Sequence, residues 1–412
     1  MMEAQVKRVH FRGILESRGK LTVEAELELQ DGSLGLASSP VAIAPGRREQ
    51  RRSFIQALGP LDGDDGEEIF RKLRHRIEGG RFNSQAHFDS FVEQIPAAAE
   101  LGADVRLVLS VAFCRASSKS RGISLLEQLV QLVQSSGSRP AVPRPLVNIF
   151  SGGVHDASCK VPFQQIMFTP DFGNIRANIE AGLAVYAAVE ERLEESGREF
   201  RHSASSGMQL SGVSHIELLQ ELDEVIGQLK YPREKACLAI DVAAEHLRTE
   251  NGCYRFGTAT ISGAELFERL KEIVRSYNVQ FLEDPFDPSD EDLWRASATQ
   301  LSPSTVVVGD DLFSTNSANI KPGLATGILL KLNQVGSVTG ALQAAATARQ
   351  AGLTLCVSHR SGETEDTVMC DLAVALGATY IKVGGPRRGD RIAKYNQLIR
   401  LAEQLGVSMG SI

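Results

Sequence analysis

The chain has 412 residues, of which 42% are hydrophobic, and its formal net charge is -7 at pH 7. This length predicts two domains, and the apolar content is sufficient for a large hydrophobic core. The acidic balance argues against a nucleic-acid or anionic-membrane surface. No run of residues approaches the ~18–20 continuous apolar positions of a membrane-spanning helix.

The N-terminal residues and the cysteines indicate the same compartment. The opening residues include Glu3, Lys7 and Arg8 and lack the apolar region of a signal peptide. The six cysteines are far apart in the sequence and form no CxxC pair. We therefore expect a cytoplasmic protein whose thiols are reduced.

Residues 1–125 have the pattern of a small α+β domain. Residues 21–29 alternate apolar and polar side chains, which is typical of a half-buried antiparallel strand. Asp31 and Gly32 then predict a hairpin turn. Strands followed by helices indicate an α+β fold, and helical patterns do follow, at 66–77, 85–94 and 102–115.

Residues 140–412 have a different pattern, which begins after the Ser-rich stretch 135–140. Short apolar runs alternate here with amphipathic helical segments, for example 216–229 and 264–277. This repetition predicts parallel strands joined by helical crossovers. About eight runs over ~270 residues favour a closed α/β barrel, with strands near 146–150, 163–168, 236–240, 279–282, 305–308, 328–330, 353–357 and 380–381.

Three successive predicted strands end in carboxylates. They are Asp241, Glu283 and Asp310. Working residues of such barrels lie at the carboxyl ends of the strands, so the three side chains are expected to converge. A divalent cation would relieve their repulsion, and all-oxygen ligation favours Mg²⁺. The alternative is that they pair with lysines or cap helices.

The next three strands end in cationic or anion-binding groups. Lys331 and Lys382 follow two of them, and His359, Arg360 and Ser361 follow the strand between. Arg360 can hold a phosphate bidentately, with Ser361 adding a hydrogen bond. A lysine can act as a base if nearby positive charge lowers its pKa, and the same charges would stabilise an enolate. This pattern predicts Mg²⁺-assisted proton abstraction α to a carboxylate, on a phosphorylated or otherwise anionic small acid.

The motifs around these residues resemble those of enolase. They are specific, they occur in enolase order, and the resemblance is strongest over residues 236–405. The N-terminal stretch 16–24 is similar to the enolase DSRGNPTVE signature, and Gly152 to His155 is similar to its GGSH segment. The strongest segments are 241–244, 283–286, 309–312, 330–337, 358–366 and 381–397.

The resemblance implies an enolase-type hydro-lyase that interconverts 2-phosphoglycerate and phosphoenolpyruvate, with two Mg²⁺ ions and a homodimer. Lys331 would be the base, and Lys382 would neutralise the substrate carboxylate. The catalytic residues implied are Lys331, Lys382, His155 and Gln165. The substrate contacts implied are Gln164, His359, Arg360, Ser361 and Lys382. The metal ligands implied are Asp241, Glu283 and Asp310.

Three positions depart from the enolase pattern. Ala44 stands where the lid carries a metal-binding Ser, and Gln165 replaces a Glu on the second barrel strand. Ser205 stands where the acid for the departing hydroxyl would fall. Losing a positioned general acid typically costs ~10²–10⁴ in rate.

These departures leave three functions open. The first is an enolase that uses water or another residue as its acid. The second is a divergent enzyme that keeps the enolate chemistry but acts on another acid, such as a phosphonate or carboxyphosphonate relative of phosphoenolpyruvate. The third is a non-catalytic protein that binds such a ligand.

Overall fold

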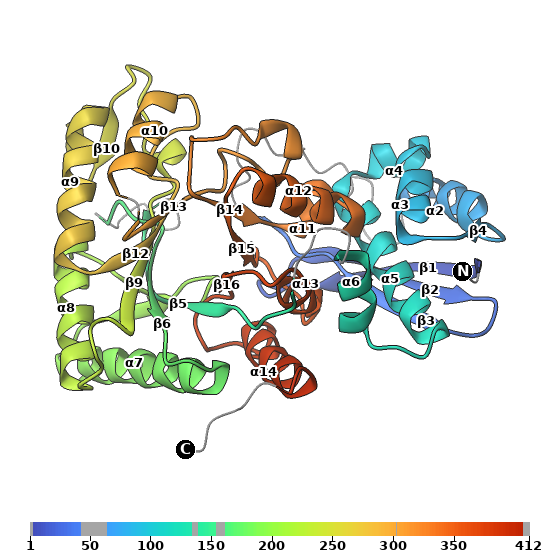
Figure 1. Cartoon of the computed structure of the whole chain (residues 1–412), viewed down its shortest axis with the longest axis horizontal. Coiled ribbons are helices and arrows are strands. Elements are labelled where there is room, and N and C mark those ends of the chain that lie inside the picture. The colour runs from blue at the N-terminus through green and yellow to red at the C-terminus, as the bar shows by residue number, and fades with distance from the viewer. Residues whose placement is uncertain (1–2, 43–63, 134–138, 154–160, 302, 407–412) are drawn as a thin grey trace.

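The computed structural model describes residues 3–42, 64–133, 139–153, 161–301 and 303–406. These ranges form a small N-terminal domain, on the right of Figure 1, and a larger barrel domain on the left. This arrangement confirms the α/β fold class predicted from the sequence. Within the described ranges, no helix combines the length and the apolar character needed to cross a membrane.

The N-terminal domain is built on a four-stranded sheet with the order β3-β2-β1-β4. β2 occupies the predicted range, Leu21–Leu29, and pairs with β1 on one side and β3 on the other, both antiparallel. Gly32, at φ +85, makes the tight turn between β2 and β3. The other strands are β1 (Ala4–Leu15), β3 (Leu34–Ser38) and β4 (Arg81–Phe82).

Helices cover one face of this sheet, and the predicted segments are among them. α5 is the central one and packs on β2 and β3. Most of its side chains are buried, because it lies between the sheet and the other helices. The helices are α2 (Asp64–Ile77), α3 (Gln85–Glu93), α4 (Pro96–Leu101), α5 (Ala103–Ser120) and α6 (Leu125–Val133).

The larger domain contains a closed barrel of eight strands, as predicted. Its ring order is β5-β6-β9-β12-β13-β14-β15-β16, and the pairing of β16 with β5 closes it. The strands are β5 (Arg144–Ser151), β6 (Gln165–Pro170), β9 (Ala236–Asp241), β12 (Val279–Glu283), β13 (Val306–Gly309), β14 (Gly327–Leu330), β15 (Thr354–Ser358) and β16 (Tyr380–Lys382).

Helices surround the barrel and bury the outer face of its strands (Figure 1). The major ones are α7 (Ile175–Glu195), α8 (His215–Gln228), α9 (Gly263–Ser276), α10 (Glu291–Gln300), α12 (Val338–Gln350), α13 (Val368–Leu376) and α14 (Gly389–Gln404). α8 begins with a capping box between Ser214 and Glu217, which satisfies two backbone donors at its first turn.

The prediction of a wholly parallel barrel is wrong at β6. This strand runs antiparallel to both neighbours, β5 and β9. It follows β5 after only 13 residues (152–164), and a return in the opposite direction needs no helical crossover. The reversal brings the N-terminal end of β6 to the mouth formed by the carboxyl ends of the other strands.

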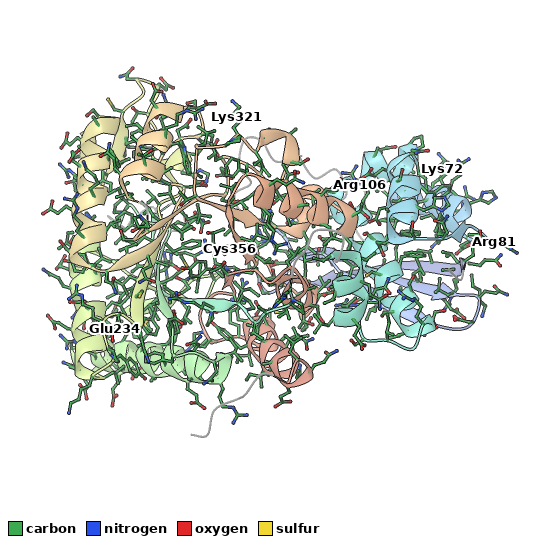
Figure 2. The ribbon with its side chains drawn as sticks, viewed as in Figure 1. Lys72, Arg81, Arg106, Glu234, Lys321 and Cys356 are labelled. Carbon is green, nitrogen blue, oxygen red and sulfur yellow. The ribbon has the colours of Figure 1, made fainter. Side chains whose placement is uncertain are left out.

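A layer of eight side chains fills the barrel interior, one from each strand. Phe281 and Tyr380 pack edge to face there, with ring centroids 5.3 Å apart. Figure 2 shows Cys356, another member, inside the barrel. The layer comprises Leu146, Met167, Ala239, Phe281, Val308, Leu329, Cys356 and Tyr380. It forms an apolar floor beneath the barrel mouth.

The N-terminal domain contacts the loop that follows β15. The Arg115 guanidinium on α5 binds the Asp366 carboxylate with two hydrogen bonds, of 2.7 and 2.8 Å. The Ser17 backbone N–H donates to the Glu363 carbonyl at 2.7 Å. The N-terminal domain therefore braces the loop that carries the predicted anion-binding residues.

Candidate active site

The barrel mouth is lined by the residues two positions beyond the floor layer. Side chains alternate along a strand, so residues two apart point to the same face. On β6, which runs the other way, the equivalent residue lies two positions before Met167 and is Gln165. On five other strands the rule gives Asp241, Glu283, Asp310, Lys331 and Lys382.

The structure brings the predicted site residues of the described chain into one pocket of about 50 Å³. The predicted metal ligands and bases there are Asp241, Glu283, Asp310, Lys331 and Lys382. The other predicted residues there are Gln164, Gln165, Ser205, His359, Arg360 and Ser361. His155 and Ala44 fall outside the described residues, and their roles stay predictions.

Lys382 bridges two of the three predicted metal ligands. Its Nζ lies 2.7 Å from Asp241 Oδ2 and 2.7 Å from Glu283 Oε2, and all three side chains are buried. Burial lowers the pKa of Lys382, but the two carboxylates outweigh it and the pKa is raised. Burial and the Asp241 charge raise the pKa of Glu283 to about 8. One ammonium therefore does not fully compensate the two carboxylates.

Lys331 forms an ion pair with the third predicted ligand, Asp310. Burial lowers the pKa of Lys331, but the Asp310 carboxylate outweighs it and the net shift is upward. Neighbouring positive charge, from Arg360, does lower the pKa of Lys331, but it does not outweigh Asp310 in the protein alone, so the expected lowering depends on a bound metal. Lys331 can act as a base only when another cation engages Asp310, because an ion-paired ammonium keeps its proton.

The oxygen groups around these lysines fit a divalent cation. Among the described residues, the buried atoms Asp310 Oδ1 and Gln165 Oε1 accept no hydrogen bond. Five carboxylates face three cationic side chains in this pocket, which leaves two formal negative charges if all ionise. Mg²⁺ prefers oxygen ligands and is usually bound through one or two carboxylates. Asp241, Glu283 and Asp310 are therefore suited to hold such an ion.

Two further carboxylates lie in the pocket, and the sequence pattern did not single them out. Carboxylate oxygens of Asp284, Asp310 and Asp311 lie within 4.8 Å of one another. Both oxygens of Asp284 accept backbone N–H groups, from Asp310 and Asp311, each at 2.9 Å. Asp284 thus fixes the loop that presents Asp310. In the sequence Asp284 directly follows Glu283 at the end of a strand. That position could have identified Asp284 as a site residue.

Buried side chains hold the predicted anion-binding residues His359 and Arg360 in place. Arg360 Nη1 donates to Asn333 Oδ1 at 3.0 Å, and the Arg360 backbone N–H donates to Glu363 Oε1 at 2.9 Å. His359 Nδ1 contacts the buried guanidinium of Arg391. Burial and the Arg391 charge lower the pKa of His359 well below its usual range. His359 is therefore neutral at pH 7 and presents its other ring nitrogen as a donor.

The segment around Ser205 is anchored through its backbone. The Ser205 carbonyl accepts the Gly385 N–H at 2.8 Å and Asn148 Nδ2 at 3.4 Å. The carbonyl of Ala204 accepts Arg391 Nη2 at 3.1 Å. Ser205 and Gln165 both line the pocket. The two positions at which the resemblance to enolase predicts acidic side chains therefore carry an alcohol and an amide.

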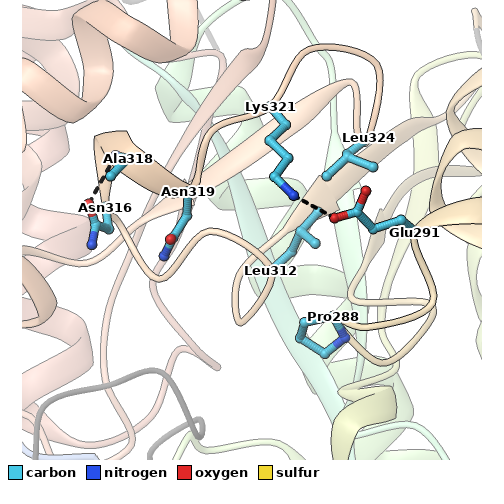
Figure 3. Close-up of a pocket in the computed structure, with 8 residues that line it drawn as sticks. All are labelled: Pro288, Glu291, Leu312, Asn316, Ala318, Asn319, Lys321 and Leu324. Atoms are coloured by element: carbon cyan, nitrogen blue, oxygen red, sulfur yellow. Dashed lines mark hydrogen bonds and ion pairs between the residues drawn. The ribbon is translucent and has the colours of Figure 1, made fainter.

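A larger cavity, of about 510 Å³, lies outside this mouth and is lined by Pro288, Glu291, Leu312, Asn316, Ala318, Asn319, Lys321 and Leu324 (Figure 3). Its two charged side chains, Lys321 and Glu291, pair with each other at 2.6 Å. Asn316 Oδ1 accepts the Ala318 N–H at 3.0 Å. The polar groups of this cavity are thus paired with one another. The larger cavity is therefore not the candidate active site.

Comparisons with known proteins agree with this geometry. The chain matches the family "Enolase, N-terminal domain" over residues 6–129 and "Enolase, C-terminal TIM barrel domain" over residues 139–410. It is 34% identical to "Enolase" of Aeropyrum pernix over 429 aligned positions, which cover 98% of this chain and 95% of the relative. The chain belongs to the enolase family and is an enolase-type lyase.

Proposed function

We propose that this chain catalyses the Mg²⁺-dependent interconversion of 2-phosphoglycerate and phosphoenolpyruvate. The observation that carries the proposal is the arrangement of the barrel mouth. Three carboxylates and two lysines occupy equivalent positions on five strands, above one apolar floor. Such an arrangement exceeds what binding of an anion alone requires.

Each residue of the barrel mouth has a role in the proposed reaction that follows from its position. Lys331 takes the α-proton, and Lys382 faces the substrate carboxylate, where positive charge stabilises the enolate. Arg360 and Ser361 bind the phosphoryl group, with the neutral His359 as a further hydrogen-bond donor. Gln164 and Gln165 bind from the opposite wall of the barrel.

Asp241, Glu283 and Asp310 would hold the magnesium. When bound, the ion supplies Lewis-acid stabilisation of the charge that develops on the substrate carboxylate. The carboxylates also keep Lys331 and Lys382 in place above the floor, since each lysine is paired with at least one of them.

A second function is favoured by one specific observation. Gln165 and Ser205 line the pocket where enolases have acidic groups, and neither side chain can deliver a proton at pH 7. An enzyme that formed the enolate without expelling hydroxide would not need an acid there. Its substrate would be another phospho- or phosphono-carboxylate, such as a carboxyphosphonate relative of phosphoenolpyruvate.

Formation of phosphoenolpyruvate from 2-phosphoglycerate, followed by ultraviolet absorbance in Mg²⁺ buffer, distinguishes the two functions. The proposal predicts a turnover in the usual enzyme range of about 1–10³ s⁻¹, abolished in Lys331→Ala. Lys321→Ala is the matched control, because that lysine lies in the separate cavity. No product from a folded, Mg²⁺-binding protein would contradict the proposal and favour the second function.

A further inference from the structure

We propose that His246 is the acid that protonates the departing hydroxyl of the substrate. This inference rests on the proposed dehydration and assigns the group that Gln165 and Ser205 do not supply. Three observations carry it: the position of His246 in the pocket, its separation from Lys331 by three strands of the barrel, and the lack of a partner for its ring among the described residues.

The chain turns sharply after β9 and places His246 at the pocket. Ala243 adopts φ +47, a left-handed conformation that is uncommon for a residue with a side chain. A single 3-10 turn follows, Ala244–His246, and the Ala244 N–H donates to the Asp284 carbonyl at 3.1 Å. His246 consequently lines the same pocket as Gln165 and Lys331, and it is only partly buried.

The strand order separates His246 from the base by three strands around the mouth. Lys331 follows β14, and in the closed ring of eight strands β14 stands opposite β6. His246 follows β9, the direct neighbour of β6. An acid bound between Lys331 and His246 could therefore present its α-carbon to the lysine and its hydroxyl-bearing carbon to the histidine. An acid distinct from the base is required there, because Lys331 receives the α-proton.

The imidazole of His246 is available for chemistry. Among the described residues its ring makes no hydrogen bond or ion pair, and its backbone N–H donates to the Ala243 carbonyl at 3.1 Å. His359, the other histidine of the pocket, is instead held by Arg391. Imidazole is also the side chain that most often serves as a general acid.

The step balances without a further reactant. The electron pair left on the α-carbon by proton removal forms the new carbon–carbon double bond. The bond between the adjacent carbon and its hydroxyl breaks, and its electron pair stays on oxygen. The protonated His246 ring gives its proton to this oxygen, which leaves as water. The neutral ring then regains a proton from solvent, to which it is partly exposed.

Dehydration and α-hydrogen exchange, measured on the same variant, test the proposal. In His246→Asn, phosphoenolpyruvate formation should fall by ~10²–10⁴-fold, the range for loss of a general acid. Exchange of the α-hydrogen of 2-phosphoglycerate with D₂O should stay near the wild-type rate, because Lys331 is untouched. His246→Gln is the second variant, and added imidazole should restore part of the lost dehydration. His75→Asn, at an exposed position of α2, is the control.

Two results would overturn the assignment while leaving the proposed function intact. One is dehydration at the wild-type rate in both His246 variants. The other is equal loss of dehydration and exchange, which indicates a structural role. A wild-type protein that exchanges the α-hydrogen but forms no phosphoenolpyruvate would refute the proposed function and this inference together.

Discussion

At the scale of single residues, Lys382 has the most demanding environment. It lies buried between Asp241 and Glu283, and removing it would leave two buried carboxylates without their cation. We predict that Lys382→Ala in metal-free buffer loses about 3–5 kcal/mol of unfolding free energy, the cost of breaking a buried pair. Urea unfolding measures this loss. Lys321→Ala, at a half-exposed pair, should lose less than about 1 kcal/mol.

Mg²⁺ should restore part of the stability of Lys382→Ala, since an ion held by Asp241 and Glu283 replaces the missing charge and binds only the folded state. Unfolding curves recorded with EDTA and with Mg²⁺ provide the comparison. Identical curves would contradict the assignment of these carboxylates as a metal site.

At the scale of elements, the segment that carries Ser205 depends on close approach of its backbone to β5. A Cβ added at Gly207 would lie 2.5 Å from Asn148 Nδ2 and 2.5 Å from Ser151 Oγ. Asn148 and Ser151 are buried and hydrogen-bonded to each other at 2.9 Å, so moving either side chain to make room for the Cβ would break this bond. Gly207→Ala should therefore displace Ser205 and lower activity by about tenfold or more.

Steady-state kinetics on Gly207→Ala provides the measurement, and Gly227→Ala is its control, because a Cβ at Gly227 meets nothing within 4 Å. The control should keep full activity and gain slightly in helix stability. Unchanged kinetics in Gly207→Ala would show that the Ser205 segment does not need its present position.

At the scale of the whole molecule, the two domains are joined by a partly buried ion pair between α5 and the loop after β15. Arg115 binds Asp366 bidentately, and Asp366 also accepts the Ser38 N–H at 3.1 Å. Arg115→Ala should cost about 2–4 kcal/mol in unfolding free energy, measured by chemical denaturation. Lys72→Ala, at an exposed pair with Glu68, should cost about 0.5 kcal/mol or less. Equal losses would show that the domains are not coupled through Arg115.

The oligomeric state also belongs to this scale, and a homodimer stays a prediction from the family. Sedimentation should give twice the 44.6 kDa mass of one chain. A species of 44.6 kDa at micromolar concentration would contradict it.

The sequence predicted the eight barrel strands, because buried strands read as short apolar runs with turns between them. It predicted Asp241, Lys331 and Lys382 at the mouth for the same reason, since a polar residue directly after such a run marks a strand end. The reversal of β6 was missed because an apolar run does not show the direction of its strand, and the signal that could have shown it was the short connection at 152–164. His246 was missed because loop conformation places it, and Ala243 in its left-handed conformation has no sequence signature. Asp284 could have been found, because it stands next to Glu283 at a strand end.

The central claim is that Lys331 removes a proton α to a carboxylate in a Mg²⁺-dependent step. The measurement that tests it most directly is exchange of the α-hydrogen of 2-phosphoglycerate in D₂O, followed by proton NMR. The account predicts exchange that requires Mg²⁺ and disappears in Lys331→Ala, whatever the fate of the hydroxyl group. Exchange that persists in Lys331→Ala, or none in the Mg²⁺-bound wild-type protein, would contradict it.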